Sequence, residues 1–197
     1  MPRRISRKNA RCKEIAMATV TIIGAGMMGS ALAFPARENG NRVRIVGTPL
    51  DREIIESAKR TNRHPKFKRD FPDGVEFYQI EDMDRAVEGA DMIIGGVSSF
   101  GVDWFGENVL PRIPESIPVL SVTKGLMDTP DGRLLTYPEV WQKKLDAIGS
   151  RLELNAIGGP CTSYELVAHD QTEVAFCGKN METLRKLKKI MATDYYH

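Results

Sequence analysis

The sequence predicts an α/β fold with a doubly wound, mainly parallel sheet. Two observations support this prediction. From Ala18 onward, short apolar runs rich in β-branched residues alternate with segments of helical periodicity, which is typical of βαβ units. A glycine-rich turn joins the first apolar run to the first helical segment. Right-handed crossovers between parallel strands would then place helices on both faces of the sheet.

The expected elements can be placed in chain order. The runs predicted as strands are Thr19–Ile23, Arg42–Val46, Val75–Tyr78, Met92–Val97, Val119–Val122, Leu152–Ile157 and Glu173–Cys177. The segments with helical spacing between them include Asp51–Arg60, Met83–Glu88, Pro138–Leu145 and Met181–Met191. The stretch Thr61–Gly74 is rich in basic residues and prolines and is predicted to be a loop. Loops of that length are often functional.

Length and composition indicate one large globular domain. The chain has 197 residues, of which 42% are hydrophobic and 27% charged, enough to bury a core. No apolar run approaches the roughly 20 residues of a membrane span, so none is expected. Cys12, Cys161 and Cys177 are widely spaced and form no CxxC pair. This argues against a disulfide framework or a metal site and fits a reducing, cytoplasmic compartment.

The basic residues are concentrated at the start of the chain. Residues 1–17 contain six of the 28 basic residues and one of the 26 acidic ones, which leaves a net charge of −3 for the rest. The body therefore offers no electrostatic basis for binding nucleic acid. We predict that residues 1–17 are a disordered extension, or precede a natural start at Met17. A targeting peptide is an alternative, and a nucleic-acid arm is disfavoured because it lacks aromatic residues that stack on bases.

The glycine-rich turn is the strongest local signal of function. Gly24, Gly26 and Gly29 form a GxGxxG pattern directly after the strand Thr19–Ile23, at the start of a helix that should end near Gly40. In this context the first glycine permits the tight turn, the second lets the backbone approach a pyrophosphate, and the third lets the helix pack on the sheet. The helix N-terminus then receives the phosphates. Residues 18–197 are therefore predicted to be a Rossmann-type domain that binds NAD or NADP.

Two neighbouring features bear on this prediction. Pro35 lies well inside the first helix and is expected to kink or shorten it. At the end of the second strand, Gly47 stands where NAD-specific folds place an acid that holds the ribose. Arg52 can pair with a 2′-phosphate, whereas Asp51 can bind the ribose or cap the next helix. The choice between NAD and NADP stays open, with use of both favoured.

Three further motifs follow later predicted strands, where ligands bind in open α/β sheets. They are Val97-Ser98-Ser99, Thr123-Lys124-Gly125-Leu126 and Gly158-Gly159-Pro160-Cys161-Thr162-Ser163-Tyr164-Glu165. The last motif should open another helix, with a hydroxyl residue at its N-cap. Together with the GAGxxGxALA start, the motifs resemble the N-terminal domain of NAD(P)-dependent glycerol-3-phosphate dehydrogenase of the archaeal or bacterial type, over roughly residues 18–195.

The resemblance implies hydride transfer between a nicotinamide and dihydroxyacetone phosphate or glycerol 3-phosphate, a small phosphorylated three-carbon substrate. Such an enzyme would serve glycerol-3-phosphate and carbohydrate metabolism and phospholipid biosynthesis. Lys124 would contact both cofactor and substrate, as the catalytic residue found here. Gly159 and Cys161 would join Lys124 in binding substrate. Cofactor contacts would come from Gly24, Gly26, Met27, Met28, Gly29, Ser98, Lys124 and Ser163.

Several residues depart from the family pattern or carry no signal. Cys161 stands where the family usually has Ser or Thr, and a thiol is a weaker hydrogen-bond donor. Otherwise Cys161 and Cys177 are expected to be buried small residues. The spacing of His64, His169 and His197 suggests neither a metal site nor a catalytic triad, so each is expected to have a structural role.

The resemblance implies that a second lysine, from an all-helical C-terminal domain, handles the proton. We expect that domain to be absent from this chain, because Lys186, Lys188 and Lys189 lie too early to supply the second lysine. We therefore expect this polypeptide to bind a dinucleotide but to reduce dihydroxyacetone phosphate poorly, because loss of proton transfer alone costs ~10²–10⁴-fold in rate. An apolar inter-domain surface would favour association, for example as a homodimer. The alternatives are a ketopantoate or hydroxy-acid reductase, and a non-catalytic dinucleotide-binding module.

Overall fold

The computed structural model describes residues 17–197, so the prediction for residues 1–17 lies almost wholly outside the described residues. Its sheet has the strand order β3-β2-β1-β4-β5-β8-β9, and every strand is parallel to its neighbours except β9, which pairs antiparallel with β8. This confirms the doubly wound, mainly parallel prediction. The strands are β1 (Thr19–Ile23), β2 (Arg42–Val46), β3 (Val75–Tyr78), β4 (Met92–Gly95), β5 (Val119–Ser121), β8 (Leu154–Gly158) and β9 (Ala175–Cys177).

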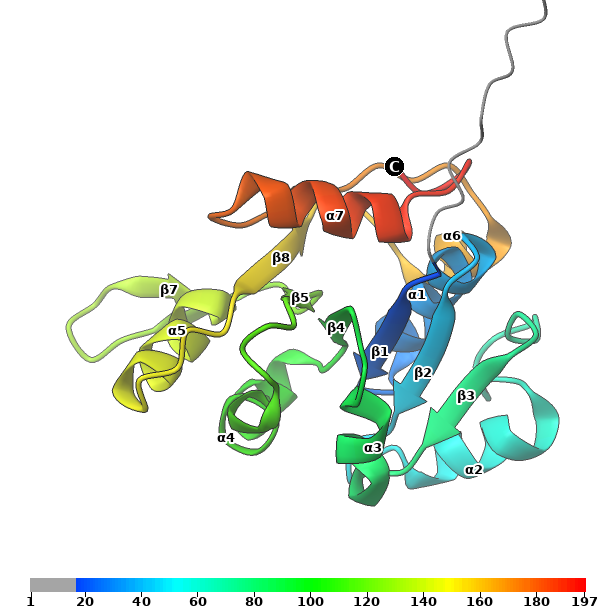
Figure 1. Cartoon of the computed structure of the whole chain (residues 1–197), viewed down its shortest axis with the longest axis horizontal. Helices are drawn as coiled ribbons and strands as arrows, with labels where there is room; N and C mark the ends of the chain where they lie inside the picture. Colours follow the sequence, from blue (N-terminus) through cyan, green and yellow to red (C-terminus); the bar gives the residue numbers. More distant parts are fainter. Residues whose placement is uncertain (1–16) are drawn as a thin grey trace, which may run out of the picture.

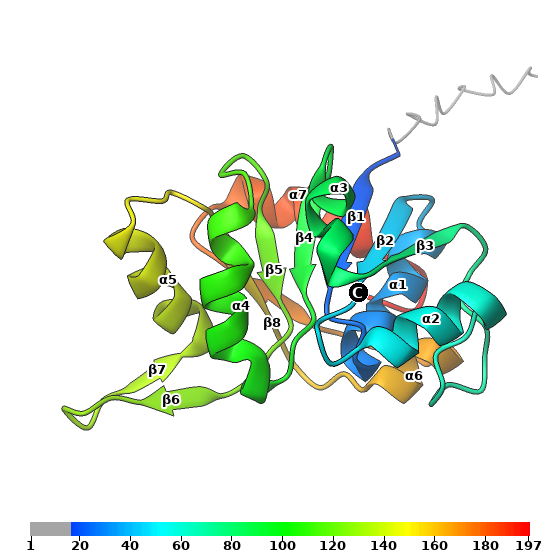
Figure 2. The ribbon, with the colours of Figure 1, turned by 90° about the horizontal axis from the view of Figure 1, so that it is seen from below.

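Helices cover both faces of this sheet (Figures 1 and 2). They are α1 (Met27–Glu38), α2 (Arg52–Thr61), α3 (Met83–Val87), α4 (Val102–Asn108), α5 (Tyr137–Ala147), α6 (Ser163–Ala168) and α7 (Met181–Met191). A short antiparallel hairpin of β6 (Leu126–Asp128) and β7 (Leu134–Thr136) projects beyond the sheet next to α5 (Figure 2). Single 3₁₀ turns lie at Ile80–Asp82, Ser99–Gly101 and Leu110–Arg112.

Alternation along the strands divides the interior into two cores. In β1, Val20 and Ile22 pack into the core that contains α1, α6 and α7, whereas Ile23 packs into the core that contains α3, α4 and α5. Successive strand side chains point to opposite faces, so a strand covered on both sides is apolar throughout. The second core includes the fully buried Trp141, whose indole Nε1 donates to the Val102 carbonyl at 2.8 Å. The apolar runs in the sequence thus correspond to burial on both faces.

The predicted elements are present, some with the predicted bounds and the others with shifts of one or two residues at their ends. The strand expected to reach Val97 ends at Gly95, and the strand before Lys124 ends at Ser121. Pro35 does not shorten the first helix, which continues to Glu38 before Gly40 takes a positive φ of 83°. The hairpin β6–β7 and helix α4 were not among the predicted elements.

The predicted loop after α2 packs against the first helix. Its Phe67 and Phe71 rings lie 6.3 and 5.8 Å, between centroids, from the ring of Phe34 in α1. His64 is buried, and its Nδ1 accepts from the Lys66 backbone N–H at 3.1 Å. His64 is thus packed into the structure, although its buried Nε2 has no hydrogen-bond partner among the described residues. The predicted loop is thus anchored by its aromatic side chains against Phe34, in the second half of α1.

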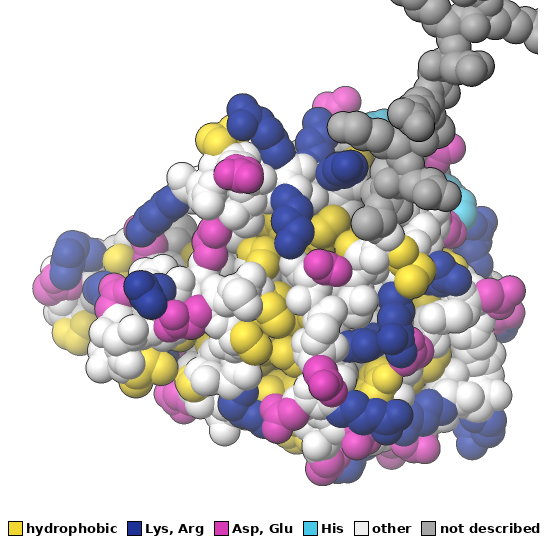
Figure 3. Space-filling model, in the orientation of Figure 1, with side chains coloured by type: hydrophobic (Ala, Val, Ile, Leu, Met, Phe, Trp, Pro, Cys, Tyr) yellow, Lys and Arg dark blue, Asp and Glu magenta, His cyan; other side chains and the backbone are white. Residues whose placement is uncertain are grey.

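The surface of the described residues shows the distribution of charges and the exposure of the cysteines. Basic and acidic side chains are interspersed over the face shown in Figure 3, consistent with the near balance of charge in the body of the chain. Cys161 is half-buried, but Cys177 is exposed, so the prediction that Cys177 is buried is wrong. No helix in the part of the chain described here combines the length and apolar character of a membrane span.

Candidate functional site

The glycine turn between β1 and α1 has the geometry that its three glycines predict. Gly24 has a φ of 114°, and a Cβ there would lie 2.7 Å from the Gly96 carbonyl carbon. A Cβ on Gly29 would lie 2.1 Å from the Gly24 oxygen, so only glycine lets α1 approach the turn this closely. By contrast, a Cβ on Gly26 would meet nothing closer than the Gly96 oxygen, at 4.0 Å. Space therefore remains over Gly26, where a phosphate would approach.

The N-terminus of α1 is available to an anion. Gly26 is the N-cap residue and supplies no side-chain hydrogen bond, and the first turn has no acidic residue. Helix N-termini present backbone N–H groups and a positive dipole end, which together bind phosphates. The open Gly26 and this uncapped end fit a dinucleotide diphosphate.

Gly96, which follows β4, packs closely against the glycine turn. A Cβ at Gly96 would lie 2.9 Å from both the Gly24 oxygen and the Gly29 Cα. Its backbone N–H donates to the Ile23 carbonyl at 2.8 Å. Sequence reasoning missed this role, although the Gly95-Gly96 pair at the end of a buried strand was a visible signal of close backbone approach.

Asp51 joins the loop after β2 to the glycine turn. Its Oδ2 accepts from the Ala25 N–H at 3.1 Å, the Thr48 N–H at 2.9 Å and the Thr48 hydroxyl at 2.8 Å. The carboxylate makes no capping bond to α2 although Asp51 occupies the N-cap position. The alternative that Asp51 caps the helix is therefore wrong. Its Oδ1 makes no hydrogen bond within the described part of the chain, which leaves one carboxylate oxygen for a ligand.

Gly47 and Arg52, the other two residues considered for the choice between NAD and NADP, also make contacts within the protein. A Cβ on Gly47 would lie 2.6 Å from Cγ1 of Ile55, so packing of α2 on β2 excludes an acid at this position. The Arg52 guanidinium forms an ion pair with Glu81 on the surface, where exposed pairs contribute little stability.

A groove of about 410 Å³ runs along the carboxyl ends of β2, β1 and β4, at the point where the strand order reverses. We call it the first groove. Its lining includes Gly24, Gly26 and Ser98, the three residues that the sequence analysis predicts to contact the cofactor there, and Asp51. Val97 of the predicted Val97-Ser98-Ser99 motif also lines it, together with residues that the sequence analysis did not single out: Thr48, Pro49, Leu50, Gly96, Phe100, Gly101 and Trp104. Phe100 is 98% exposed at its rim. A flat apolar ligand would cover such a side chain.

A second cavity of about 330 Å³ lies at the carboxyl ends of β5 and β8, beside the N-terminus of α1. We call it the lysine pocket. Five predicted site residues from four segments of the chain line it: Met27, Met28, Lys124, Cys161 and Ser163. Val122 and Ile157 complete the lining. The predicted residues thus divide between the two cavities, except for Gly29, which packs beneath the turn, and Gly159, which lines neither cavity.

A hydrogen bond joins Lys124 of the lysine pocket to Gly159, which is not one of the residues that line the pocket. The Lys124 ammonium donates to the Gly159 carbonyl oxygen, and Gly159 has a φ of 109°, a conformation that favours glycine. Burial raises the pKa of the Cys161 thiol, while the Lys124 charge opposes this shift. Cys161 is therefore largely a neutral thiol near pH 7 that can donate only a weak hydrogen bond.

Helix α6 positions the last predicted residue, Ser163. The Thr162 hydroxyl accepts from the Glu165 N–H at 3.3 Å, and the Glu165 carboxylate accepts from the Thr162 N–H at 3.0 Å. This capping box fixes the helix start and confirms the hydroxyl N-cap predicted there. Among the residues the structure describes, no group of His, Cys, Asp and Glu side chains could hold a metal ion.

Comparison with known proteins gives this geometry a context. A relative from Archaeoglobus fulgidus, an NADP(+)-dependent glycerol-3-phosphate dehydrogenase, is 38% identical over 178 residues, which cover 90% of this chain and 51% of the relative. A glycerol-3-phosphate dehydrogenase [NAD(P)+] from Geobacillus kaustophilus is 25% identical over 91% of this chain and 50% of its own. The chain thus spans about half the length of the curated relatives it matches.

Solved structures agree on the fold. Glycerol-3-phosphate dehydrogenase from Coxiella burnetii has a TM-score of 0.77 at 20% identity and covers 92% of this chain and 53% of its own. A ketopantoate reductase from Ralstonia eutropha gives a TM-score of 0.58 at 18% identity, covering 88% of this chain and 53% of its own. Because a family model described as NAD-dependent glycerol-3-phosphate dehydrogenase N-terminus matches residues 19–184, this chain belongs to that family.

Proposed function

We propose that this chain forms the dinucleotide-binding half of an NAD(P)-dependent glycerol-3-phosphate dehydrogenase. The observation that carries the proposal is the pair of cavities on either side of the glycine turn, one at the switch point of the sheet and the other at the carboxyl ends of β5 and β8. Ligands of doubly wound folds lie in the crevice outside the carboxyl ends of the strands, where the strand order reverses. The family's cofactor is NAD or NADP.

In this proposal the dinucleotide lies across both cavities. The adenosine half occupies the first groove, where Phe100 and Trp104 offer aromatic surface and the free Oδ1 of Asp51 can accept from a ribose hydroxyl. The diphosphate lies over Gly26 at the start of α1. The nicotinamide half points toward the lysine pocket, past Met27 and Met28. This orientation follows from the strand order, since adenosine binds over the first two strands of such folds.

Lys124 is the residue we assign to substrate. It lines the lysine pocket and is exposed, with its ammonium turned toward the Gly159 carbonyl. A phosphorylated three-carbon substrate in this pocket would be attracted by the positive charge of Lys124. It would also accept the hydrogen bond that the lysine now donates to the Gly159 carbonyl. The bound nicotinamide would supply or accept the hydride at the substrate carbon. Lys124 orients the substrate and stabilises negative charge on its oxygen.

Lys124 is the sole lysine lining this pocket among the described residues. We therefore infer that the 197-residue polypeptide binds dinucleotide but turns over dihydroxyacetone phosphate poorly, because no second lysine stands ready to transfer the proton. Titration of the chain with NADH and NADPH, followed by nicotinamide fluorescence, tests binding. Oxidation of NADH with dihydroxyacetone phosphate tests turnover. Absence of nucleotide binding would refute the proposal, and turnover comparable to that of the Archaeoglobus fulgidus relative would refute the inference about the isolated chain.

The remaining assignments are also proposals. We place the protein in the cytoplasm, because Cys161 and Cys177 are free thiols and such thiols persist in reducing compartments. We further propose that it forms a homodimer, since large apolar side chains such as Leu126 and Leu134 of the hairpin are exposed. Light scattering coupled to size exclusion gives the mass and decides between monomer and dimer.

A further inference from the structure

The turn that carries Lys124 is tied to the segment after β4 by a side chain. The Thr123 hydroxyl donates to the Val97 carbonyl at 2.6 Å. Val97 lines the first groove, and Lys124, the residue after Thr123, lines the lysine pocket. The hydrogen bond therefore joins the wall of one cavity to a turn that forms part of the other.

The backbone on both sides of this hydrogen bond is held by its surroundings. Val97 is buried, and its backbone nitrogen would lie 3.0 Å from a Cβ on Gly24. The Val122 N–H donates to the Gly95 carbonyl at 3.1 Å and so continues the β4–β5 ladder beyond its last strand pair. Thr123 thus leaves the ladder from a fixed point, and its hydroxyl bond directs the chain into Lys124.

An aromatic ring closes the turn on the other side of Lys124. Gly125 has a φ of 143°, which favours glycine. A Cβ there would lie 2.8 Å from both Cε2 and the hydroxyl oxygen of Tyr137, the buried first residue of α5. Lys124 itself is exposed. Its backbone is therefore flanked by the Thr123 hydrogen bond and the Tyr137 contact, while its side chain is open to a ligand.

The place of Lys124 relative to the cofactor matters for the proposed reaction. The group that binds the substrate and the nicotinamide that exchanges the hydride must stand at a set separation, since small displacements of such groups are costly. A lysine side chain has a flexible four-carbon stem. Anchoring its backbone to the wall of the cofactor groove limits where the ammonium can reach.

We propose that Thr123 is a positioning residue, which fixes Lys124 relative to the cofactor through its hydrogen bond to Val97. The inference rests on the proposed function, in which Lys124 binds the substrate. Valine has the shape of threonine but no hydroxyl, so Thr123→Val removes the donor to the Val97 carbonyl and frees the turn at one end. Thr123→Ser keeps the hydroxyl and with it the anchor.

The test measures substrate affinity in variants of the 197-residue chain saturated with NADH. Calorimetric titration uses glycerol 3-phosphate, because both ligands are then in their reduced form and no hydride moves. Thr123→Val should weaken binding about tenfold, as expected when a hydrogen bond from a charged group is lost, and Thr123→Ser should retain it. Thr21→Val is the matched control, because the Thr21 hydroxyl donates to the Ala86 carbonyl at the same 2.6 Å and Thr21 lines neither cavity.

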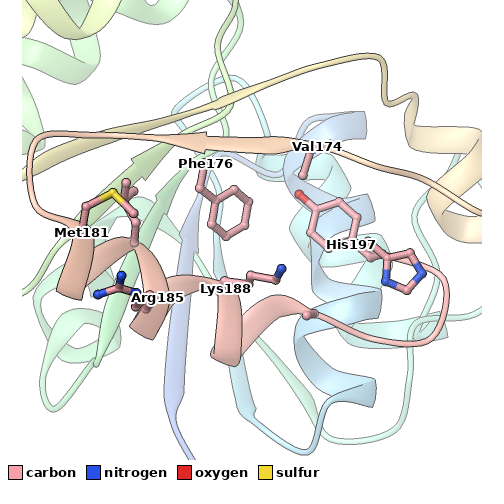
Figure 4. A pocket seen from close by; sticks show the side chains of 9 residues that line it. Val174, Phe176, Met181, Arg185, Lys188 and His197 are labelled. Atoms are coloured by element: carbon pink, nitrogen blue, oxygen red, sulfur yellow. The ribbon is translucent and has the colours of Figure 1, made fainter.

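A second control concerns the phosphate of this ligand. A third cavity, of about 310 Å³, lies between β9 and α7 and carries Arg185 and Lys188 (Figure 4). These side chains also attract a phosphate. Lys188→Met should leave the affinity for glycerol 3-phosphate unchanged if the ligand binds in the lysine pocket.

Backbone order in the ligand-free chain gives a readout that needs no substrate. Amide order parameters from nuclear magnetic relaxation should be near the rigid value of about 0.85 at Lys124 and Gly125, and should fall toward about 0.6 in Thr123→Val. Thr123→Ser and Thr21→Val should keep the rigid value. A loss of stability without a positioning role would not separate the two valine variants.

The outcomes distinguish this inference from the proposed function. Unchanged affinity or unchanged order parameters in Thr123→Val would overturn the inference alone, and so would an equal loss of affinity in Thr21→Val. Absence of NADH binding to the unmodified chain would refute the proposed function. NADH binding without glycerol 3-phosphate binding, or loss of the latter in Lys188→Met, would refute the role of Lys124 and this inference with it.

Discussion

Replacement of single glycines in the turn separates ligand binding from folding. Gly29→Ala places a methyl group 2.1 Å from the Gly24 oxygen, a backbone atom that cannot move aside cheaply. Overpacking of this kind costs about 1–3 kcal/mol, and such a short contact belongs at the top of that range. The higher helix propensity of alanine returns roughly 1 kcal/mol. A net loss of about 2 kcal/mol should lower the melting temperature by about 4–8 °C in a domain of this size.

Gly26→Ala should have the opposite pattern. Its new Cβ would have no atom nearer than 4.0 Å, and the φ of −63° at Gly26 suits alanine. The loss of a better N-cap residue and the reduced entropy of the unfolded chain nearly cancel, each being about 0.5 kcal/mol. The methyl group would occupy the space over which the diphosphate must lie. We expect at least a tenfold loss of NADH affinity, about 1.4 kcal/mol.

Two measurements on the same samples decide the matter. Calorimetry without ligand gives the melting temperatures, and NADH fluorescence titration gives the dissociation constants. The reasoning predicts a destabilised Gly29→Ala variant and a stable Gly26→Ala variant that binds NADH weakly. A Gly26→Ala variant that melts early yet binds NADH normally would refute the assignment of roles within the turn.

Three further predictions concern residues around the site. Because burial raises the pKa of the Cys161 thiol, iodoacetamide should modify Cys161 more slowly than the exposed Cys177 at pH 8. Bound NADH should slow the modification of Cys161 further. Peptide mapping by mass spectrometry measures the rate at each cysteine. Gly47→Asp should lower the free energy of unfolding, because its Cβ would lie 2.6 Å from Ile55 Cγ1. Adding Ile55→Ala should restore part of that free energy, measured by urea unfolding. If the effects of the two substitutions simply add, the steric explanation is wrong. Burial lowers the pKa of His64, so the unfolded chain binds the proton more readily. The free energy of unfolding should therefore fall as the pH drops below about 6.5. The fall should be less steep in the His64→Phe variant. Parallel pH profiles of stability for the two proteins would disprove this.

Much of the fold and part of the site follow from residues close together in the chain. The order of strands and helices reflects local apolar runs covered on both faces. The turn Gly24–Gly29 was recognisable because strand, glycines and helix are contiguous, and the capping box of Thr162 and Glu165 lies within one helical turn. Motif order then pointed to Lys124 and Ser163, which the structure brings into one pocket. These features depend on backbone conformation and turn chemistry, which neighbouring residues largely set.

Contacts between distant segments decided the rest. The sequence by itself determined a dinucleotide turn of three glycines, but the Gly96 backbone that closes beneath it lies some 70 residues away. Likewise Asp51 binds Ala25 rather than capping its own helix, and packing against Ile55 excludes an acid at Gly47. The antiparallel direction of β9 is decided only when the sheet is assembled. Close packing between remote segments sets these features, and no local pattern in the chain encodes such distances.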